Sequence, residues 1–168
     1  MTSRPAAPEP LHIVQSRRDA ALDWLVTAVP YVRFLGAGFE RRGDELTALL
    51  PFQDMLIGNP TLPALHGGAT AAFMEVTAII ELAWAFLWED IEAGRIDPSA
   101  AGASPVLPKT IDFSVDYLRS GQPRDAYARA TVTRSGRRYA SVHVECWQDN
   151  RSRPIAMATG HFLMPEIG

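Results

Sequence analysis

The chain has 168 residues, of which 47% are hydrophobic and 21% are charged, proportions that are typical of one soluble globular domain with one core. The formal net charge of −3 argues against a protein that wraps on nucleic acid, because such proteins are usually basic. The single cysteine, Cys146, excludes an intramolecular disulfide and a multi-cysteine zinc site, and it fits a cytoplasmic location.

The first part of the chain is predicted to contain a tail, a helix and a hairpin. Residues 1–10 are rich in proline and alanine, so we expect a mobile tail. They contain no apolar run before the prolines, so we expect no signal peptide. Across residues 11–29 apolar side chains recur at helical spacing, which predicts an amphipathic helix that Pro30 stops. Two short apolar segments, 34–40 and 45–52, flank a glycine-containing turn and predict a β-hairpin.

The most apolar part of the chain, residues 69–88, is long enough to raise the question of a membrane span. Glu75 and Glu81 lie within it, and charges at bilayer depth are costly. We therefore predict a helix that is buried inside the protein and ends between residues 89 and 94, and we expect no membrane partner. Glycine, proline, alanine and serine dominate residues 94–108, which predicts a loop.

After this loop the hydrophobic pattern changes to a period of two, which indicates strands separated by turns. The apolar positions of this pattern are Ile111, Phe113, Val115 and Tyr117, then Ala128, Ala130 and Val132, then Ala140, Val142, Val144 and Cys146. A last strand is predicted over residues 154–164. One apolar helix with an antiparallel sheet is an α+β arrangement, and a sheet curled around the helix would cover it on every side. We expect residues 11–168 to form a single domain.

Two carboxylates interrupt the long helix. Glu75 is surrounded in the sequence by small or apolar residues, and an ionised carboxylate in such a place is costly unless it is paired or functional. We interpret Glu75 as the catalytic carboxylate, with a local solvent gap or an arginine partner as the alternative. For Glu81, further along the same helix, a structural ion pair or a subunit contact is the preferred interpretation.

Gly67 and Gly68 open the same helix. The first backbone N–H groups of a helix lack intrahelical partners and attract negative charge, so this end can hold the oxygen of a polarised carbonyl. A tight turn that needs glycine is the alternative. Gly67 and Glu75 are eight positions apart, a separation of about 12 Å along a helix. One carbonyl cannot touch both, so a shared site requires two antiparallel helices in a dimer.

Further polar side chains are weaker candidates, each with a structural alternative. His66 can orient the loop, contact substrate, act as a base, or be a hydrogen-bonded structural residue. Asn59 lies in a Gly-Asn-Pro turn, and Thr110 opens a strand from which its hydroxyl can reach a water near the carboxylate. A cluster at a predicted hairpin tip can hold phosphates or be solvated. Its members are Arg134, Arg137 and Arg138.

Three segments carry a family resemblance, together with the order of the elements: LHGGATAAFMEV, PKTIDFSVDYLRSGQP and ATVTRSGRRYASVHVE. Over residues 38–164 the chain resembles the PaaI-like acyl-CoA thioesterases of the hotdog-fold (4-hydroxybenzoyl-CoA thioesterase-like) superfamily. The resemblance implies an antiparallel sheet wrapped around a long central helix, paired into a homodimer or a dimer-of-dimers homotetramer. It implies hydrolysis of an acyl-CoA to free acid and CoA, with no nicotinamide, flavin or metal cofactor.

The resemblance also implies roles for residues. A backbone N–H around Gly67 or Gly68 would polarise the thioester carbonyl, and Glu75 of the partner subunit would act as general base or nucleophile. In similar enzymes this acid is aspartate or glutamate. The family's asparagine usually lies six residues before the histidine, whereas Asn59 lies seven before it. Thr110 matches a strand position where related enzymes place a Ser or Thr that orients water.

Other chemistries lack their signatures. The sequence contains no HExxH, CxxC, P-loop or GxSxG motif, and no metal is implied. Hydration of enoyl-CoA is less favoured, because the Asp/His pair that it usually needs early on the helix is missing. A non-catalytic acyl-CoA sensor or assembly protein is the non-enzymatic alternative, since a fold alone does not give a function.

Overall fold

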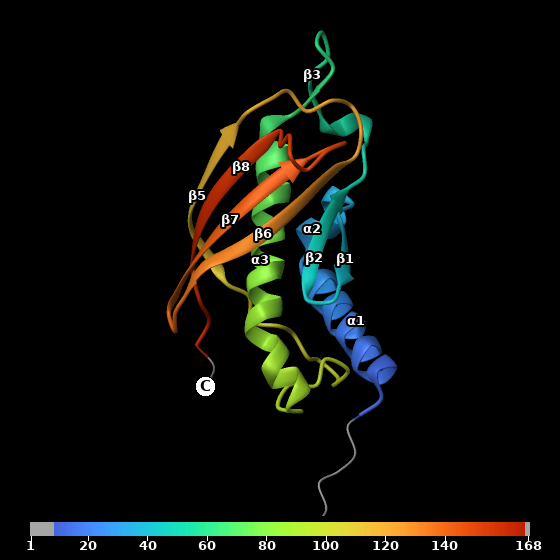
Figure 1. The fold of residues 1–168 in the computed structure, drawn as a ribbon, viewed down its shortest axis with the longest axis vertical. Helices are drawn as coiled ribbons and strands as arrows, with labels where there is room; N and C mark the ends of the chain where they lie inside the picture. Colours follow the sequence, from blue (N-terminus) through green and yellow to red (C-terminus); the bar gives the residue numbers. More distant parts are fainter. Residues whose placement is uncertain (1–8, 167–168) are drawn as a thin grey trace, which may run out of the picture.

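The computed structural model describes residues 9–166, in which a six-stranded antiparallel sheet curls around one long helix (Figure 1). The helices are α1 (Leu11–Ala28), α2 (Pro30–Leu35) and α3 (Gly67–Glu92), with a 3-10 turn at Asp54–Leu56. The sheet has the order β1 (Gly38–Arg42), β2 (Glu45–Leu50), β6 (Ala126–Ser135), β7 (Tyr139–Trp147), β8 (Ala156–Leu163) and β5 (Lys109–Tyr117). β3 (Ile57–Asn59) and β4 (Ala64–Leu65) form a separate hairpin. Most of the predicted N-terminal tail, residues 1–8, lies outside the described residues.

The N-terminal region contains two helices rather than one. α1 ends at Ala28, shortly before Pro30 as predicted, and Pro30 itself begins α2, which was not predicted. Proline suits the first turn of a helix, because the N–H that it lacks has no intrahelical partner there. α2 ends at Gly36, whose φ of 68° lies in the left-handed region that favours glycine. The strand predicted over residues 34–40 is therefore wrong in its first half, and β1 begins at Gly38.

α3 is the core helix, as the sequence predicts. It is the one helix within residues 9–166 that is long and apolar enough to cross a membrane. However, 61% of its most apolar 18-residue segment is buried inside the protein. Two hydrophobic clusters cover it, one from the sheet and one from α1 and β2. Its end at Glu92, followed by Gly94 with a φ of 69°, falls within the predicted range.

The alternation predicted for the later strands is confirmed in β7, where four inward side chains are fully buried: Ala140, Val142, Val144 and Cys146. It fails at the start of β5. The register of β5 against β8 shifts between Thr110 and Asp112, which is a β-bulge. Ile111 is consequently 58% exposed rather than directed inward like Phe113, and Thr110 is directed towards α3.

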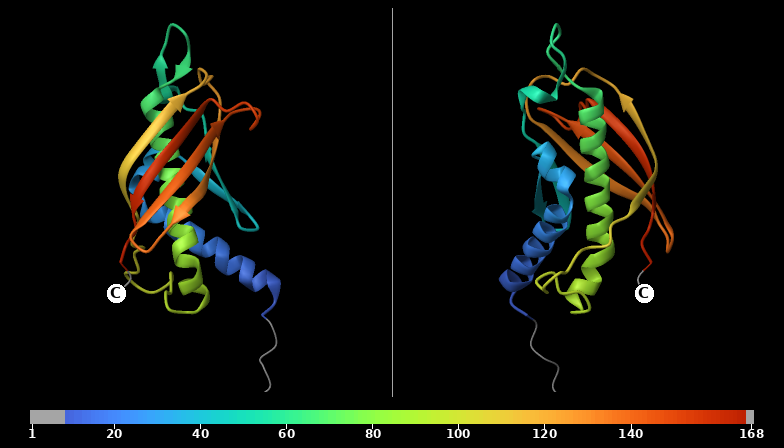
Figure 2. Two further views of the ribbon diagram at one scale, coloured as in Figure 1. Left: turned by 60° about the vertical axis from the view of Figure 1, so that its left-hand side comes forward. Right: turned by 180° about the vertical axis from the view of Figure 1, so that it is seen from behind.

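Two features of this arrangement set the position of the candidate site. β5 is the last strand of the sheet, so one edge of it has no pairing partner within residues 9–166. The β3–β4 hairpin projects beyond the N-terminal end of α3, while α1 runs beside the opposite half of that helix (Figure 2). The beginning of α3 and both ends of β5 therefore lie at the periphery of the molecule.

Candidate active site

Glu75 is half-buried on α3 and faces the start of β5. Its Oε1 accepts a hydrogen bond from Thr110 Oγ1 at 2.6 Å. No arginine, lysine or histidine within residues 9–166 forms an ion pair with it, so the alternative of an arginine partner is not supported within one chain. The β5 bulge makes the contact possible, because it turns Thr110 inward. One carboxylate oxygen is thus fixed by a hydroxyl, and the second is available to a water or a substrate.

His66 is the N-cap of α3. Its Nδ1 accepts a hydrogen bond from the Gly68 N–H at 2.9 Å, so a neutral ring carries its proton on Nε2. The Gly67 N–H has no hydrogen-bond partner in the described part of the chain. The sequence predicts that the N–H of Gly67 or Gly68 binds the carbonyl oxygen, and of these two donors only the Gly67 N–H is available to do so. The structural interpretation of His66 is the one that the geometry supports.

Tyr117 binds the backbone carbonyl of Gly67. From the end of β5, its hydroxyl donates a hydrogen bond to Gly67 O at 2.7 Å. A Cβ at position 67 would lie 3.2 Å from the Tyr117 ring and hydroxyl, closer than side chains normally approach. A larger residue here would therefore require the Tyr117 side chain to shift by a few tenths of an ångström. Tyr117 was predicted only as an apolar strand position and not as a site residue, since a tyrosine at the end of an alternating strand has no specific signature.

The two halves of the candidate site lie apart within one chain. Thr110 at the start of β5 fixes Glu75, and Tyr117 at the end of β5 fixes Gly67. Gly67 and Glu75 are eight positions apart, or about 12 Å along α3. A single thioester carbonyl does not span that distance. The structure of one chain therefore supplies each half of a composite site, but not the two halves together.

Asn59 belongs to the turn of the β3–β4 hairpin. Its Oδ1 accepts hydrogen bonds from the backbone N–H groups of Thr61 (3.0 Å) and Leu62 (3.2 Å). This pattern is an Asx turn, in which a side-chain oxygen stabilises the backbone that follows it. The turn interpretation of Asn59 is therefore supported, and its side-chain oxygen is already occupied.

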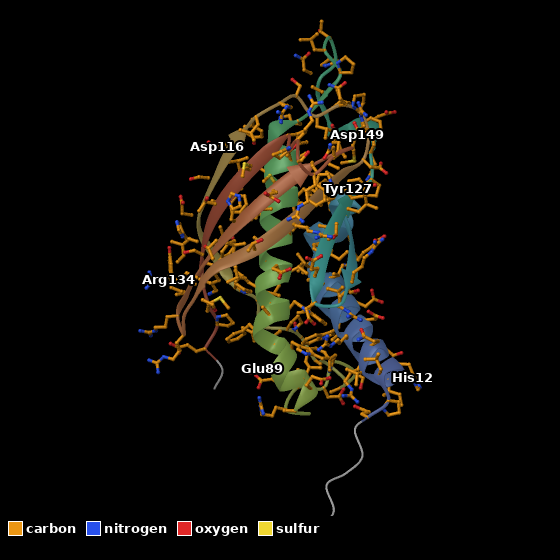
Figure 3. The ribbon with its side chains drawn as sticks, in the orientation of Figure 1. His12, Glu89, Asp116, Tyr127, Arg134 and Asp149 are labelled. Carbon is orange, nitrogen blue, oxygen red and sulfur yellow. The ribbon has the colours of Figure 1, made fainter. Side chains whose placement is uncertain are left out.

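The three arginines of the predicted cluster are exposed at the β6–β7 hairpin. Arg138 forms an ion pair with Glu166 at 3.0 Å, and Arg134 lies at the end of the sheet opposite Tyr127 and Asp149 (Figure 3). Through β8 this hairpin neighbours the start of β5, because Leu163 pairs with both Tyr139 and Lys109. The arginines thus lie at the same end of the sheet as the Glu75–Thr110 pair.

Two other ionisable groups are altered by burial. Burial raises the pKa of Glu81 to about 7. No ion pair involving Glu81 occurs within residues 9–166, so the ion pair expected for it is not found; the subunit contact stays a prediction. Burial also raises the pKa of the Cys146 thiol to about 12, which leaves it without nucleophilic thiolate near neutral pH.

Comparisons with known proteins identify relatives of this chain. Residues 59–163 match the family model described as "Acyl-CoA thioesterase N-terminal domain". The medium/long-chain acyl-CoA thioesterase YigI of Escherichia coli K12 is 29% identical over 145 residues, which cover 84% of this chain and 90% of the relative. Its counterpart from Salmonella typhimurium is 30% identical over 146 residues, with the same coverage.

Solved structures show the same fold. A Chromobacterium violaceum protein is 35% identical, with a TM-score of 0.61, and the match covers 94% of this chain and all of that protein. A Shewanella oneidensis protein related to the thioesterase superfamily is 24% identical, with a TM-score of 0.65, and the match covers 90% of this chain and 97% of that protein.

Proposed function

The chain belongs to the acyl-CoA thioesterase family, and we propose that it hydrolyses medium- and long-chain acyl-CoA to free acid and CoA at a site shared by two subunits. The chain-length range is the one named for its relatives. The observation that carries the proposal is the hydrogen bond between Glu75 and Thr110, which presents a carboxylate beside the free edge of the sheet.

The thioester carbonyl binds at the start of α3. The free Gly67 N–H donates to its oxygen, and the N-terminal end of the helix dipole favours the negative charge that develops there during reaction. The Tyr117 hydroxyl, by binding Gly67 O, keeps the first turn in place. His66 contributes by capping the neighbouring Gly68 N–H rather than by touching the carbonyl.

Glu75 of the partner subunit acts on the carbonyl carbon. As a general base it takes a proton from water, the resulting hydroxide adds to the carbonyl, the C–S bond breaks, and CoA leaves as a thiolate that is then protonated. As a nucleophile it attacks the carbonyl carbon, the C–S bond breaks, and CoA leaves as a thiolate that is then protonated. Water hydrolyses the resulting anhydride, which releases the free acid and regenerates the Glu75 carboxylate. In both routes Thr110 holds one carboxylate oxygen, so the other is presented to the reaction.

The nucleotide end of CoA then lies near the subunit that supplies Glu75. Its phosphates need cations, and the Arg137–Arg138 turn is at the same end of the sheet as Glu75. Bidentate contacts from arginine to phosphate are charge-assisted hydrogen bonds, which are stronger than neutral ones. Solvated arginines at a hairpin tip are the alternative, and their kinetic test is given below.

Two subunits related by a two-fold axis would form two equivalent sites, each with the Gly67 end of one helix and Glu75 of the other. The separation of these residues along α3 supports this homodimer. A dimer-of-dimers tetramer and a cytoplasmic location stay predictions from the sequence.

The proposal is tested by CoA release from short, medium, long and aromatic acyl-CoAs. We expect the unaltered protein to prefer medium and long chains, and Glu75→Gln to keep its fold while losing at least about 100-fold in kcat, because general acid–base catalysis is typically worth that much. Near-normal turnover by a folded Glu75→Gln protein would contradict the assignment. Tight binding of acyl-CoA without any turnover would instead support a sensor.

A further inference from the structure

A cavity of about 360 Å³ lies directly beside Gly67. The start of α3, the end of β5 and the loop that follows β5 form its walls. Ile155, which is 7% exposed, and the half-buried Leu65 provide apolar surface at its base, while Leu118 is 48% exposed and lies at its border. Arg119 and Ser120 are exposed and form a polar rim.

Most polar groups in these walls are already paired within the protein. The Tyr117 hydroxyl donates to Gly67 O, and the Thr70 hydroxyl donates to His66 O at 3.3 Å. The backbone N–H groups of Leu118 and Arg119 both donate to Ile155 O, at 2.8 and 3.1 Å. The walls therefore expose polar as well as apolar surface, but most of the polar groups are already paired, and the side chains of Leu65 and Ile155 offer hydrocarbon that suits an apolar group.

The wall cannot easily be moved aside. Gly121 is buried, and a Cβ at this position would lie 3.0 Å from Leu65 Cδ1. The Leu65 N–H donates to Gly121 O at 2.9 Å, which fixes the loop to β4. The cavity is thus a formed part of the fold, and Leu118 is a large, exposed apolar side chain among the residues that line it.

The position of the thioester decides which part of the substrate reaches this cavity. Two arms leave the carbonyl carbon, an uncharged acyl chain and a CoA arm that ends in phosphates. The arginine cluster lies at the opposite end of β6 and β7, which have 10 and 9 residues and are therefore about 30 Å long. Arg119, the cation at the rim, already donates to Pro154 O at 2.7 Å.

We propose that the cavity beside Gly67 receives the acyl chain of the substrate, and that Leu118 limits the chain length accepted. This inference rests on the proposed thioesterase function, whose carbonyl site borders the cavity. The acyl chain extends from Gly67 past Tyr117 towards Leu65 and Ile155. The CoA arm leaves in the other direction, towards the partner subunit.

The test is the chain-length profile of two variants at one position. Leu118→Trp should fill the cavity and lower kcat/KM for dodecanoyl-CoA by about tenfold or more, while butyryl-CoA should change less than about twofold, because steric differences in an apolar pocket act on the groups that reach it. Leu118→Ala should shift the preferred chain length upwards. Leu11→Trp, at an exposed leucine on the first turn of α1, is the control and should leave the profile unchanged.

Three outcomes are informative. The proposal is supported if Leu118→Trp loses more activity on long-chain acyl-CoAs than on short-chain ones. An equal loss of activity on all chain lengths would mean that the CoA arm passes Leu118. An unchanged chain-length profile would mean that the cavity is unused. Either result would overturn the proposal. If the unaltered protein hydrolyses no acyl-CoA, the proposed function fails separately. Calorimetric binding of dodecanoate to the unaltered protein and to Leu118→Trp then still decides the inference, since only the open cavity should bind it.

Discussion

Thr110 determines how Glu75 presents its carboxylate. The Thr110 hydroxyl donates a hydrogen bond to Glu75 Oε1 at 2.6 Å. Thr110→Val keeps the shape and removes the donor, so we expect kcat to fall about 10- to 100-fold with little change in KM. The loss of a hydrogen bond to a charged group is worth about 1.5–3 kcal/mol. Thr110→Ser, which keeps the hydroxyl, is the matched control. Equal activity of the valine and serine variants would show that this bond has no role in turnover.

Glu81 should make stability depend on pH. Burial raises its pKa from 4.5 to about 7 in the folded chain. Between these values the folded state holds a proton that the unfolded state has released, so the free energy of unfolding falls as pH rises from about 4.5 through about 7. Glu81→Gln removes this dependence. One pKa unit is worth about 1.4 kcal/mol, and partial exposure reduces the effect, so we expect a gain of about 1–2 kcal/mol at pH 8.

Urea unfolding at pH 5 and pH 8 measures this effect. The gain from Glu81→Gln should be larger at pH 8 than at pH 5. Glu89→Gln, at an exposed position on the same helix, provides the control and should show no such difference. A Glu81→Gln protein that is equally stabilised, or not stabilised, at both pH values would mean that the carboxylate finds a partner in the assembled protein.

At the scale of elements, the contacts of the β6–β7 hairpin do not indicate what its arginines do. Its arginines are exposed, and an exposed ion pair such as that of Arg138 with Glu166 contributes little to stability. If the hairpin holds CoA phosphates, Arg137→Ala and Arg138→Ala should raise KM several-fold more than they lower kcat, because the contact is made equally in the ground state and the transition state. The increase should weaken at high salt.

Comparing an acyl-CoA with the matching acyl-pantetheine, which lacks the nucleotide, isolates this contact. Only the acyl-CoA should lose efficiency. Arg124, which pairs with Asp149 at the opposite end of the sheet, offers a control of the same type (Figure 3). If Arg124→Ala raises KM for the acyl-CoA and the hairpin variants do not, the nucleotide lies at the other end and the hairpin arginines are solvated.

At the scale of the whole molecule, the composite site makes activity a property of two chains. Glu75→Gln removes the carboxylate from one half-site, and Gly67→Ala disturbs the other, because a Cβ there would lie 3.2 Å from Tyr117. Each homodimer should be nearly inactive. A mixture of the two should recover activity, since a heterodimer has one site that combines an intact Gly67 with an intact Glu75.

The measurement is turnover after the two variants are unfolded together and refolded, compared with each refolded alone. Random pairing makes about half of the dimers mixed, and each mixed dimer has one good site of two, so about a quarter of normal activity is expected from this symmetry. No recovery in a mixture whose mass shows mixed dimers would place both residues in one subunit's site. An active monomer in light scattering would lead to the same conclusion.

The sequence by itself determined the elements and the conspicuous residues. Helical and alternating hydrophobic patterns reflect neighbours along the chain, so the buried helix, the strands after it and the carboxylate of Glu75 are visible without coordinates. The HGG segment and its acid likewise give the family. Pro30 follows the end of the first helix, as predicted, but proline also suits the first turn of a helix, and the second helix that begins there was not predicted.

Only the tertiary structure decided which polar groups meet. Thr110 reaches Glu75 across 35 residues and Tyr117 reaches Gly67 across 50, and both contacts depend on the register of β5 rather than on any local pattern. The bulge that turns Thr110 inward and Ile111 outward is a single-residue shift, which no periodicity reveals. His66 likewise occupies the Gly68 N–H and leaves the Gly67 N–H free, a choice between adjacent donors that depends on side-chain geometry. Local order is encoded in the spacing of apolar residues, whereas the site depends on contacts that form only when distant segments are brought into register.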